Sequence, residues 1–419
     1  MNAITPPAVT LSKGQQEAYN KYASFVAKPD PGILVIAGYA GTGKSTLVKQ
    51  LLTDTESMLK TGALVSQVSK DWTMQLSATT HKAAEALADI TKCPVPTIQS
   101  VLKLVVKKDF STGESTLVPK SESSPLRNTI LFIDEASFID DHLLSWILKL
   151  TKQCKVVFIG DPAQLTPVKS ETTPVFSQGF DIVSLEEVMR QAEGNPIIDL
   201  ATNFRGVVNG EPFFQFTPDE HHVVRLPRGD FQRKIVDVFS DPGWSYNTAK
   251  VLAWRNKTVE RYNFDIREQV EGEPELGVGD YAVVNSYVNM GKKSLQSNQI
   301  VQITSIFPAQ SYGVDGWTVG IDNRTHAFLP KNIGAKTSLE KRLKKAERFD
   351  DLKKVAETWI DLRAAYACTI NKSQGSTYDS VFIDLDDIAK CTNGTQIARL
   401  LYVAVSRARH HVYMTGDLV

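Results

Sequence analysis

Residues 38–46, Gly-Tyr-Ala-Gly-Thr-Gly-Lys-Ser-Thr, constrain the fold of this chain more than any other segment. An apolar run at residues 33–37 precedes them and a helix-compatible run at residues 47–52 follows, so the order is strand, glycine loop, helix. Gly41 and Gly43 have no side chain, which lets the backbone curl around a polyphosphate with its N–H groups pointing inward. The helix N-terminus behind the loop adds partial positive charge. The segment therefore predicts a nucleotide-binding loop.

Two side chains of this loop have a chemistry of their own. In the spacing G-x-x-x-x-G-K-S, Lys44 can reach the β- and γ-phosphates, and the Ser45 hydroxyl can take a Mg²⁺ position. A chance glycine loop is the alternative for a bare glycine pattern, but the flanking strand and helix favour nucleotide binding. We expect ATP or a close relative, with Mg²⁺, to be held by Gly38, Ala40, Gly41, Thr42, Gly43, Lys44, Ser45 and Thr46.

Length and composition place the chain among globular proteins of several domains. Its 419 residues exceed one ordinary core, so two to four domains are expected. The residues are 42% hydrophobic and 22% charged, and Lys+Arg and Asp+Glu both number 47. A net charge of zero leaves nucleic-acid binding open, because a local groove can be basic on a neutral protein.

The cysteines and the N-terminal residues indicate the cellular compartment in which the protein works. The four cysteines lie far apart and form no C-x-x-C pair, which favours reduced thiols over a zinc site or a disulfide framework. Residues 1–10 have neither a basic start nor an apolar core, so no signal peptide is expected, and no apolar run has the length of a membrane span. We expect a reducing compartment, the cytoplasm of a bacterium or of a phage-infected host.

Strands and helices alternate in the first part of the chain. A helix is expected at residues 12–25 with Ser12 as its N-cap, and strands at 73–77, 129–133 and 155–159, the first two followed by helical patterns. This alternation predicts a parallel sheet covered on both faces. Residues 103–128 interrupt it with two short β-rich runs around Ser-Thr-Gly, which predicts an inserted β-hairpin. The expected first domain is 1–182.

A second α/β unit is expected from Val183, at residues 183–276 and 364–419, with a strand at 249–254 and a helix at 257–269. Residues 277–330 contain short β-rich runs separated by Gly, Asn, Asp and Ser, which predicts a small β-barrel inserted in this unit. A single long charged helix is expected at 338–363, so the whole insert is 277–363.

Polar residues follow two of the strands expected in the first sheet. Asp134 and Glu135 end one strand at the sheet edge where ligands bind, so Asp134 is a candidate Mg²⁺ ligand with Ser45 and Glu135 a candidate for polarising water. Gln164, after the next strand, is a candidate sensor of the γ-phosphate. Further along the chain, Arg190 and Arg407 are candidates for stabilising transition-state charge.

Taken in order, these segments resemble the motifs of superfamily 1 helicases through nearly the whole chain. The resemblance is strongest to the 5′→3′ branch that includes phage Dda and bacterial RecD. The matching segments are residues 12–15 (the adenine-reading segment), 38–46 (motif I), 76–87 (Ia), 97–102 (Ib), 134–137 (II), 160–167 (III), 188–190 (IV), 253–259 (the following motif), 369–377 (V) and 401–409 (VI).

The resemblance implies two RecA-like domains with ATP between them, the hairpin in the first and an SH3-like barrel in the second. It implies Gln15 as the adenine contact and adds Gly375 to the nucleotide site. The implied DNA contacts are Thr80, His81, Lys82, Ser100, Phe110, Asn256, Thr369, Lys372 and Ser373. For His81 and Lys82, exposed residues at a helix start are the alternative. In motif V, Asn371 stands where the family often has His.

The expected function is ATP-dependent unwinding of DNA by a monomer that translocates 5′→3′ on single strands and acts on fork DNA in replication, recombination or repair, with single-stranded-DNA-binding or replisome proteins as partners. Phe110, beside the expected hairpin turn, is a candidate wedge, and its alternative is packing of the hairpin on the first domain. Two other functions stay open: a translocase that displaces proteins without separating strands, and a nucleotide-switched binding protein.

Overall fold

The computed structural model describes residues 10–66, 71–108, 115–121, 123–167, 173–187, 194–273, 275–289, 294–321 and 325–418. The chain divides into two compact units, and the division falls between Asn195 and Pro196. In the part of the chain that the structure describes, none of the helices combines the length and apolar character needed to span a bilayer.

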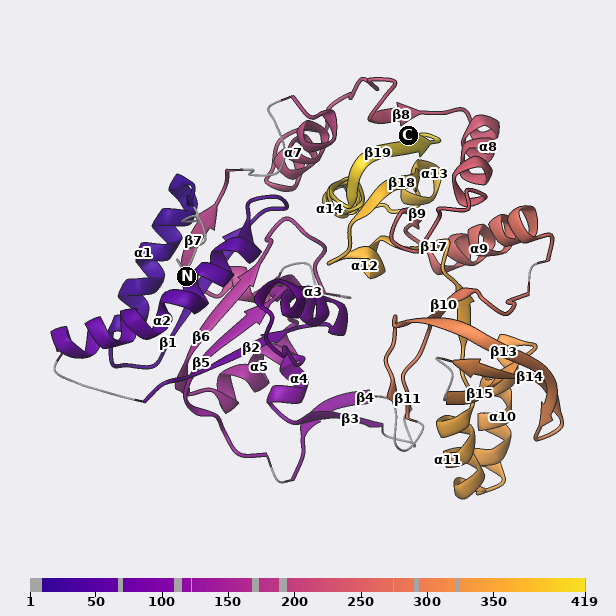
Figure 1. Cartoon of the computed structure of the whole chain (residues 1–419), viewed down its shortest axis with the longest axis horizontal. Helices are drawn as coiled ribbons and strands as arrows, with labels where there is room; N and C mark the ends of the chain where they lie inside the picture. The colour runs from indigo at the N-terminus through magenta and orange to yellow at the C-terminus, as the bar shows by residue number, and fades with distance from the viewer. Residues whose placement is uncertain are drawn as a thin grey trace, which may run out of the picture. The chain divides into compact units, whose positions relative to one another are not determined.

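The first unit is built on a five-stranded sheet in which all neighbouring strands are parallel (Figure 1). The strand order is β2-β5-β6-β1-β7, with bounds β1 (Gly32–Gly38), β2 (Thr73–Ala78), β5 (Arg127–Asp134), β6 (Gln153–Gly160) and β7 (Asp181–Leu185). The helices are α1 (Lys13–Ala27), α2 (Lys44–Ser66), α3 (His81–Thr91), α4 (Ile98–Val101), α5 (Asp141–Leu150) and α6 (Pro174–Ser177). The glycine loop joins the end of β1 to the start of α2.

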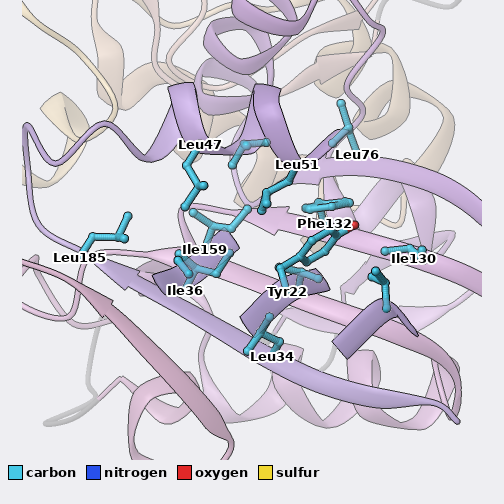
Figure 2. Packing of buried hydrophobic residues seen from close by; sticks show 14 of the residues in the cluster. Tyr22, Leu34, Ile36, Leu47, Leu51, Leu76, Ile130, Phe132, Ile159 and Leu185 are labelled. Atoms are coloured by element: carbon cyan, nitrogen blue, oxygen red, sulfur yellow. The ribbon is translucent and has the colours of Figure 1, made fainter. Parts of the chain in front are cut away.

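Alternate residues of the strands supply two hydrophobic cores, one on each face of this sheet. Figure 2 shows the first, where Tyr22 of α1 and Leu47 and Leu51 of α2 lie against Ile36 and Phe132 of the sheet. The second core uses the intervening strand residues with α4, α5 and α6. Because both faces are covered, the strands read as continuous apolar runs, which is the pattern of a buried parallel sheet.

A β-hairpin leaves the first unit between α4 and β5. Its strands β3 (Leu104–Lys108) and β4 (Ser115–Pro119) pair antiparallel from Leu104↔Pro119 to Lys108↔Ser115. The base is fixed to α5, because the Leu117 carbonyl accepts from Trp146 Nε1 at 3.0 Å and lies 2.8 Å from His142 Nε2. The tip, with Phe110, lies outside the described residues.

The second unit contains another five-stranded parallel sheet, in the order β17-β9-β18-β19-β8 (Figure 1). Its strands are β8 (Val223–Arg225), β9 (Ala249–Ala253), β17 (Ala367–Thr369), β18 (Tyr378–Asp384) and β19 (Ala408–Thr415). Its helices are α7 (Pro196–Val208), α8 (Arg228–Phe239), α9 (Asn256–Glu271), α12 (Ile370–Ser373), α13 (Leu385–Ile388) and α14 (Gly394–Ser406).

An antiparallel sheet with its own hydrophobic core is inserted between α9 and β17. Its strand order is β15-β14-β13-β10-β16, with bounds β10 (Tyr281–Val284), β13 (Ile300–Ser311), β14 (Val314–Ile321), β15 (Thr325–Pro330) and β16 (Leu362–Ala364). A short pair, β11 (Val288–Asn289) and β12 (Ser294–Leu295), and two helices, α10 (Ile333–Lys345) and α11 (Phe349–Thr358), complete the insert. Closure of this sheet into an SH3-like barrel stays a prediction.

Two boundaries differ from the sequence expectation. The second unit was expected to begin at residue 183, but β7 pairs with β1 from Leu34↔Asp181 to Gly38↔Leu185 and belongs to the first sheet. A short edge strand carries no local sign of which sheet it joins. The single helix expected at 338–363 is two helices and a strand, because Glu347 adopts a left-handed φ of 53° between α10 and α11. Neither Gly nor Pro marks this break in the sequence.

Candidate nucleotide site and nucleic-acid interface

The glycine loop is shaped as a phosphate cradle. Gly41 and Gly43 have φ values of 83° and 75°, which L side chains rarely adopt. At Gly38, an added Cβ would lie 2.9 Å from Thr42 Oγ1, so the loop also needs glycine where it leaves β1. The Thr42 hydroxyl donates to the Tyr39 carbonyl at 2.9 Å and closes the turn.

The Lys44 ammonium group is held within the loop. Lys44 Nζ donates to the carbonyls of Gly38 at 2.6 Å and Tyr39 at 2.9 Å. These are neutral acceptors, and a polyphosphate would be a stronger partner for the same ammonium because it adds the attraction between opposite charges. Ser45 and Thr46 occupy the first turn of α2, where the orphan backbone N–H groups of the helix lie.

Gln15 joins the first helix to this loop. Its side chain is buried, and Nε2 donates to the carbonyls of Thr42 at 3.0 Å and Gly43 at 3.4 Å. Its Oε1 accepts from the Ser12 backbone N–H at 3.0 Å in a capping box at the start of α1. The described contacts of Gln15 therefore brace the loop, and contact with adenine stays a prediction.

The carboxylate pair lies at the carboxyl end of β5, in the same sheet as the glycine loop. The Glu135 backbone N–H donates to Asp134 Oδ1 at 2.8 Å, and Glu135 itself has a left-handed φ of 54°. Burial raises the pKa of Asp134, whereas that hydrogen bond and the positive charge of Lys44 act in the opposite direction. A divalent cation would favour the ionised form of such a carboxyl.

Gln164 lies in the segment that follows β6. It is buried, and its Oε1 lies 3.5 Å from the hydroxyl of Ser137, two residues after Glu135. The buried Asp161 orders this segment by accepting from the Ala163 N–H at 2.9 Å. The structure thus connects the segments after β5 and β6, as the sequence predicts for residues at one edge of a parallel sheet.

The chemistry of these groups fits ATP with Mg²⁺. The cradle offers backbone N–H groups and one ammonium group to phosphates, and Asp134 and Ser45 are oxygen ligands of the kind that Mg²⁺ prefers. Bound Mg²⁺ would neutralise charge that develops on the phosphate oxygens. The roles of these residues stay predictions.

The predicted DNA contacts of the first unit lie next to the carboxylate strand. Thr80 caps α3, accepting from the Ala83 N–H at 3.2 Å, and His81 and Lys82 are exposed in the first turn. The preceding residue, Thr79, donates from its backbone to the Asp134 carbonyl at 3.2 Å and from its hydroxyl to the Glu135 carbonyl at 3.0 Å. The Ser100 side chain is exposed on α4, with its hydroxyl 2.9 Å from Thr97 Oγ1.

In the second unit, the predicted DNA contacts differ in exposure. Asn256 is exposed at the start of α9, whereas Thr369 is buried and caps α12 by accepting from the Lys372 N–H. Ser373 is buried and donates to the Ile370 carbonyl at 2.8 Å, which favours a structural role for its hydroxyl. Lys372 is half-buried, and its Nζ donates to Asn285 Oδ1 at 3.1 Å.

Arg407 is buried at the end of α14. Its guanidinium donates to the carbonyls of Val403 and Ser376, both at 3.2 Å, and to the Ser406 hydroxyl at 3.0 Å. Gly375, in the segment just before Ser376, has a left-handed φ of 74°. Arg190 lies outside the described residues.

Two side chains that organise these segments lie outside the sequence motifs. Asp387 accepts hydrogen bonds from the turn that precedes Asn256, and Asn285 accepts one from Lys372. Both contacts join residues far apart in sequence, so no local pattern marks them. An Asp-Asp pair after a buried strand, as at residues 386–387, shows that carboxylates lie there but does not indicate which groups they bind.

Comparison with known proteins adds to this geometry. The chain matches the family models of an AAA domain over residues 10–212 and of a UvrD-like helicase C-terminal domain over residues 364–415. It is 27% identical over 460 residues to the ATP-dependent DNA helicase Dda of Enterobacteria phage T4, covering 96% of this chain and 98% of Dda. It is 31% identical over 295 residues to the RecBCD enzyme subunit RecD of Buchnera aphidicola (subspecies Schizaphis graminum), covering 66% of this chain and 45% of RecD.

The fold also has a solved counterpart. A structure of Pif1 helicases at forked double-stranded DNA is 19% identical with a TM-score of 0.54, and the match covers 98% of this chain and 93% of that one. At this identity the likeness shows the fold alone, and it agrees with the predicted pair of RecA-like α/β domains.

The ordered motifs and these relatives show that the chain resembles superfamily 1 helicases, which are ATP-hydrolysing enzymes. Within that superfamily it resembles phage Dda and bacterial RecD.

Proposed function

We propose that this chain uses ATP hydrolysis to translocate 5′→3′ along single-stranded DNA and to separate the strands of a duplex at a fork. The observation that carries the proposal is the phosphate cradle with Lys44 at the sheet edge where Asp134 ends β5. The likeness to Dda over nearly the full length of both chains supports DNA as the substrate. The polarity rests on the resemblance to the 5′→3′ branch.

Each candidate residue has a separate role in the proposed reaction. Lys44 and the loop N–H groups hold the phosphates, and Asp134 and Ser45 hold Mg²⁺. Glu135 orients the attacking water and Gln164 senses the γ-phosphate. Arg407 and Arg190, from later in the chain, stabilise the charge of the transition state. Thr79 supports coupling to DNA, because it connects the Asp134–Glu135 backbone to the Thr80 cap of α3.

In biological terms, we propose a monomer that acts on single-stranded and fork DNA in the replication, recombination or repair of a bacterial or phage genome, in the cytoplasm. Single-stranded-DNA-binding or replisome proteins are its proposed partners.

Unwinding of forked and single-tailed duplexes tests this function. The protein should unwind a duplex with a 5′ tail and leave a duplex with only a 3′ tail intact. Lys44→Ala should lose DNA-stimulated hydrolysis, since one preorganised electrostatic contact is typically worth about 2.7–4 kcal/mol of barrier. A matched control is Lys49→Ala, a lysine on the same helix beyond the loop.

Three other results of this test would each support a different conclusion. Normal turnover by Lys44→Ala would remove the loop from the chemistry. DNA-stimulated hydrolysis and translocation without strand separation would support protein displacement instead. Hydrolysis that bare oligonucleotides do not stimulate would support a nucleotide switch.

A further inference from the structure

A hydrogen bond joins the segment that resembles motif V to the inserted antiparallel sheet. Lys372 lies on α12, directly after β17 of the parallel sheet, and its Nζ donates to Asn285 Oδ1 at 3.1 Å. Asn285 immediately follows β10, a strand of the insert. Both residues belong to the second unit.

The Asn285 side chain is oriented by other bonds. Its Nδ2 donates to Asp361 Oδ2 at 2.8 Å, and its backbone N–H donates to the Asp361 carbonyl at 2.9 Å. These contacts continue the ladder of β10 and β16, in which Val284 pairs with Leu362. Because Asp361 takes the amide N–H₂ group, the amide oxygen is left facing the ammonium of Lys372.

The surroundings of Lys372 differ from those of an ordinary surface lysine. Burial lowers the pKa of its ammonium group, and the nearby charge of Arg363 lowers it further. Arg363 pairs with Glu260 of α9 and lies 3.4 Å from Asp361. A lysine that binds a DNA phosphate needs its charge at the surface, whereas this ammonium is partly enclosed between two parts of the protein.

We propose that Asn285 is a positioning residue for residues 369–375. By holding Lys372, it ties this segment to the inserted sheet, so that Lys372 supports DNA-dependent ATP turnover through the insert and not as a direct phosphate contact. The inference rests on the proposed function for its readout, since it assumes that DNA stimulates hydrolysis.

Lys372→Met, Asn285→Ala and the double variant test this proposal by DNA titration of ATP turnover. Each single variant should raise the DNA concentration for half-maximal stimulation by roughly tenfold, the size expected for one lost hydrogen bond to a charged group. The double variant should be no worse than either single variant, because residues in one contact have non-additive effects.

The salt dependence of DNA binding distinguishes a Lys372 that is held by Asn285 from a Lys372 that contacts a DNA phosphate. For single strands, each phosphate contact contributes about 0.7 to the slope of log affinity against log salt. We expect Lys372→Met to leave that slope unchanged. A slope reduced by about 0.7, or effects of the two single variants that multiply in the double variant, would overturn the proposal.

Controls keep the outcomes distinct. Gln302→Ala removes an exposed polar side chain from β13 of the same sheet and should behave as the parent protein. If Asn285→Ala does not fold, the salt slope of Lys372→Met still decides between the two roles. If the parent protein shows no DNA-stimulated hydrolysis, it is the proposed function that fails. The contact between Lys372 and Asn285 is then tested by thermal unfolding, in which the losses of stability of the two single variants should not add up in the double variant.

Discussion

At the scale of single residues, Asp387 shows how one buried carboxylate can order the turn that precedes a predicted DNA contact. Its side chain is 2% exposed and accepts from the backbone N–H groups of Trp254 at 2.7 Å and Arg255 at 3.0 Å. It also accepts from Arg255 Nε at 2.6 Å and Thr258 Oγ1 at 2.5 Å. These bonds fix the turn from β9 into α9, where Asn256 is exposed. Burial favours a higher pKa for Asp387, but the hydrogen bonds from Thr258 and Arg255 outweigh it and lower the pKa.

Asp387→Asn should destabilise the protein by about 2 kcal/mol at pH 7, because it removes the charge that four donors face. A carboxylate with a lowered pKa contributes stability above its unfolded pKa of about 3.9 and loses it as the pH falls through the lower folded value. The difference between parent and variant in urea unfolding should therefore shrink below about pH 4.

Asp379→Asn is the matched control for this substitution. Asp379 pairs with Arg409 on the surface of the same unit, and an exposed pair contributes at most about 1 kcal/mol. Equal stability of Asp387→Asn and the parent protein at pH 7 would contradict the role given to Asp387.

At the scale of elements, the hairpin of β3 and β4 is a projection with an anchored base. Besides its two partners on α5, the Leu117 carbonyl lies beside a cation–π pair, with Lys149 Nζ 4.9 Å from the Trp146 ring centroid. Leu104 and Leu117 also pack against the second core of the first unit. These contacts fix the described part of the hairpin to the first unit.

Phe110→Ala should lower duplex unwinding while leaving translocation and DNA-stimulated hydrolysis intact, because stacking of an aromatic side chain on a base is worth roughly 1–3 kcal/mol. Strand separation, translocation and ATP turnover are measured on the same preparation, with Lys107→Ala, an exposed residue of β3, as the control. A parallel loss of all three activities would make Phe110 a packing residue, and full unwinding would remove the tip from the mechanism.

The elements were predictable from the sequence where the signal is local. The strand–loop–helix at residues 38–46, the cap at Ser12 and the alternating strands were found because spacing and residue type determine them. The placement of β7, the break at Glu347 and the bonds of Asp387 and Asn285 were not found. Each depends on which distant segment lies opposite, and a single sequence does not encode that in a readable pattern.

At the scale of the whole molecule, the proposed reaction requires groups from both units, and Arg407 is the described candidate from the second. Arg407→Ala should lower ATP turnover by about 10³ or more while weakening nucleotide binding far less, as is typical of an arginine finger. Steady-state hydrolysis and the binding of a fluorescent nucleotide measure the two effects.

Arg409→Ala is the control for Arg407→Ala, since Arg409 is an exposed arginine two residues further along and pairs with Asp379. Because Arg407 also bonds to three groups within its own unit, thermal unfolding of the variant must accompany the kinetics. Normal turnover by a folded Arg407→Ala protein would contradict its catalytic role.

The strand order of the second unit has a consequence for how the protein is synthesised. β19, near the end of the chain, lies between β18 and β8 inside the parallel sheet, and β8 precedes it by more than 180 residues of sequence. While a ribosome is still making the insert, β8 and β9 have no β18 or β19 between them, so the unpaired backbone groups along their edges stay available to other chains. The first unit has all its strands by Leu185 and can fold earlier. A premature stop before residue 408 would therefore release a chain with one finished domain and one open, aggregation-prone sheet.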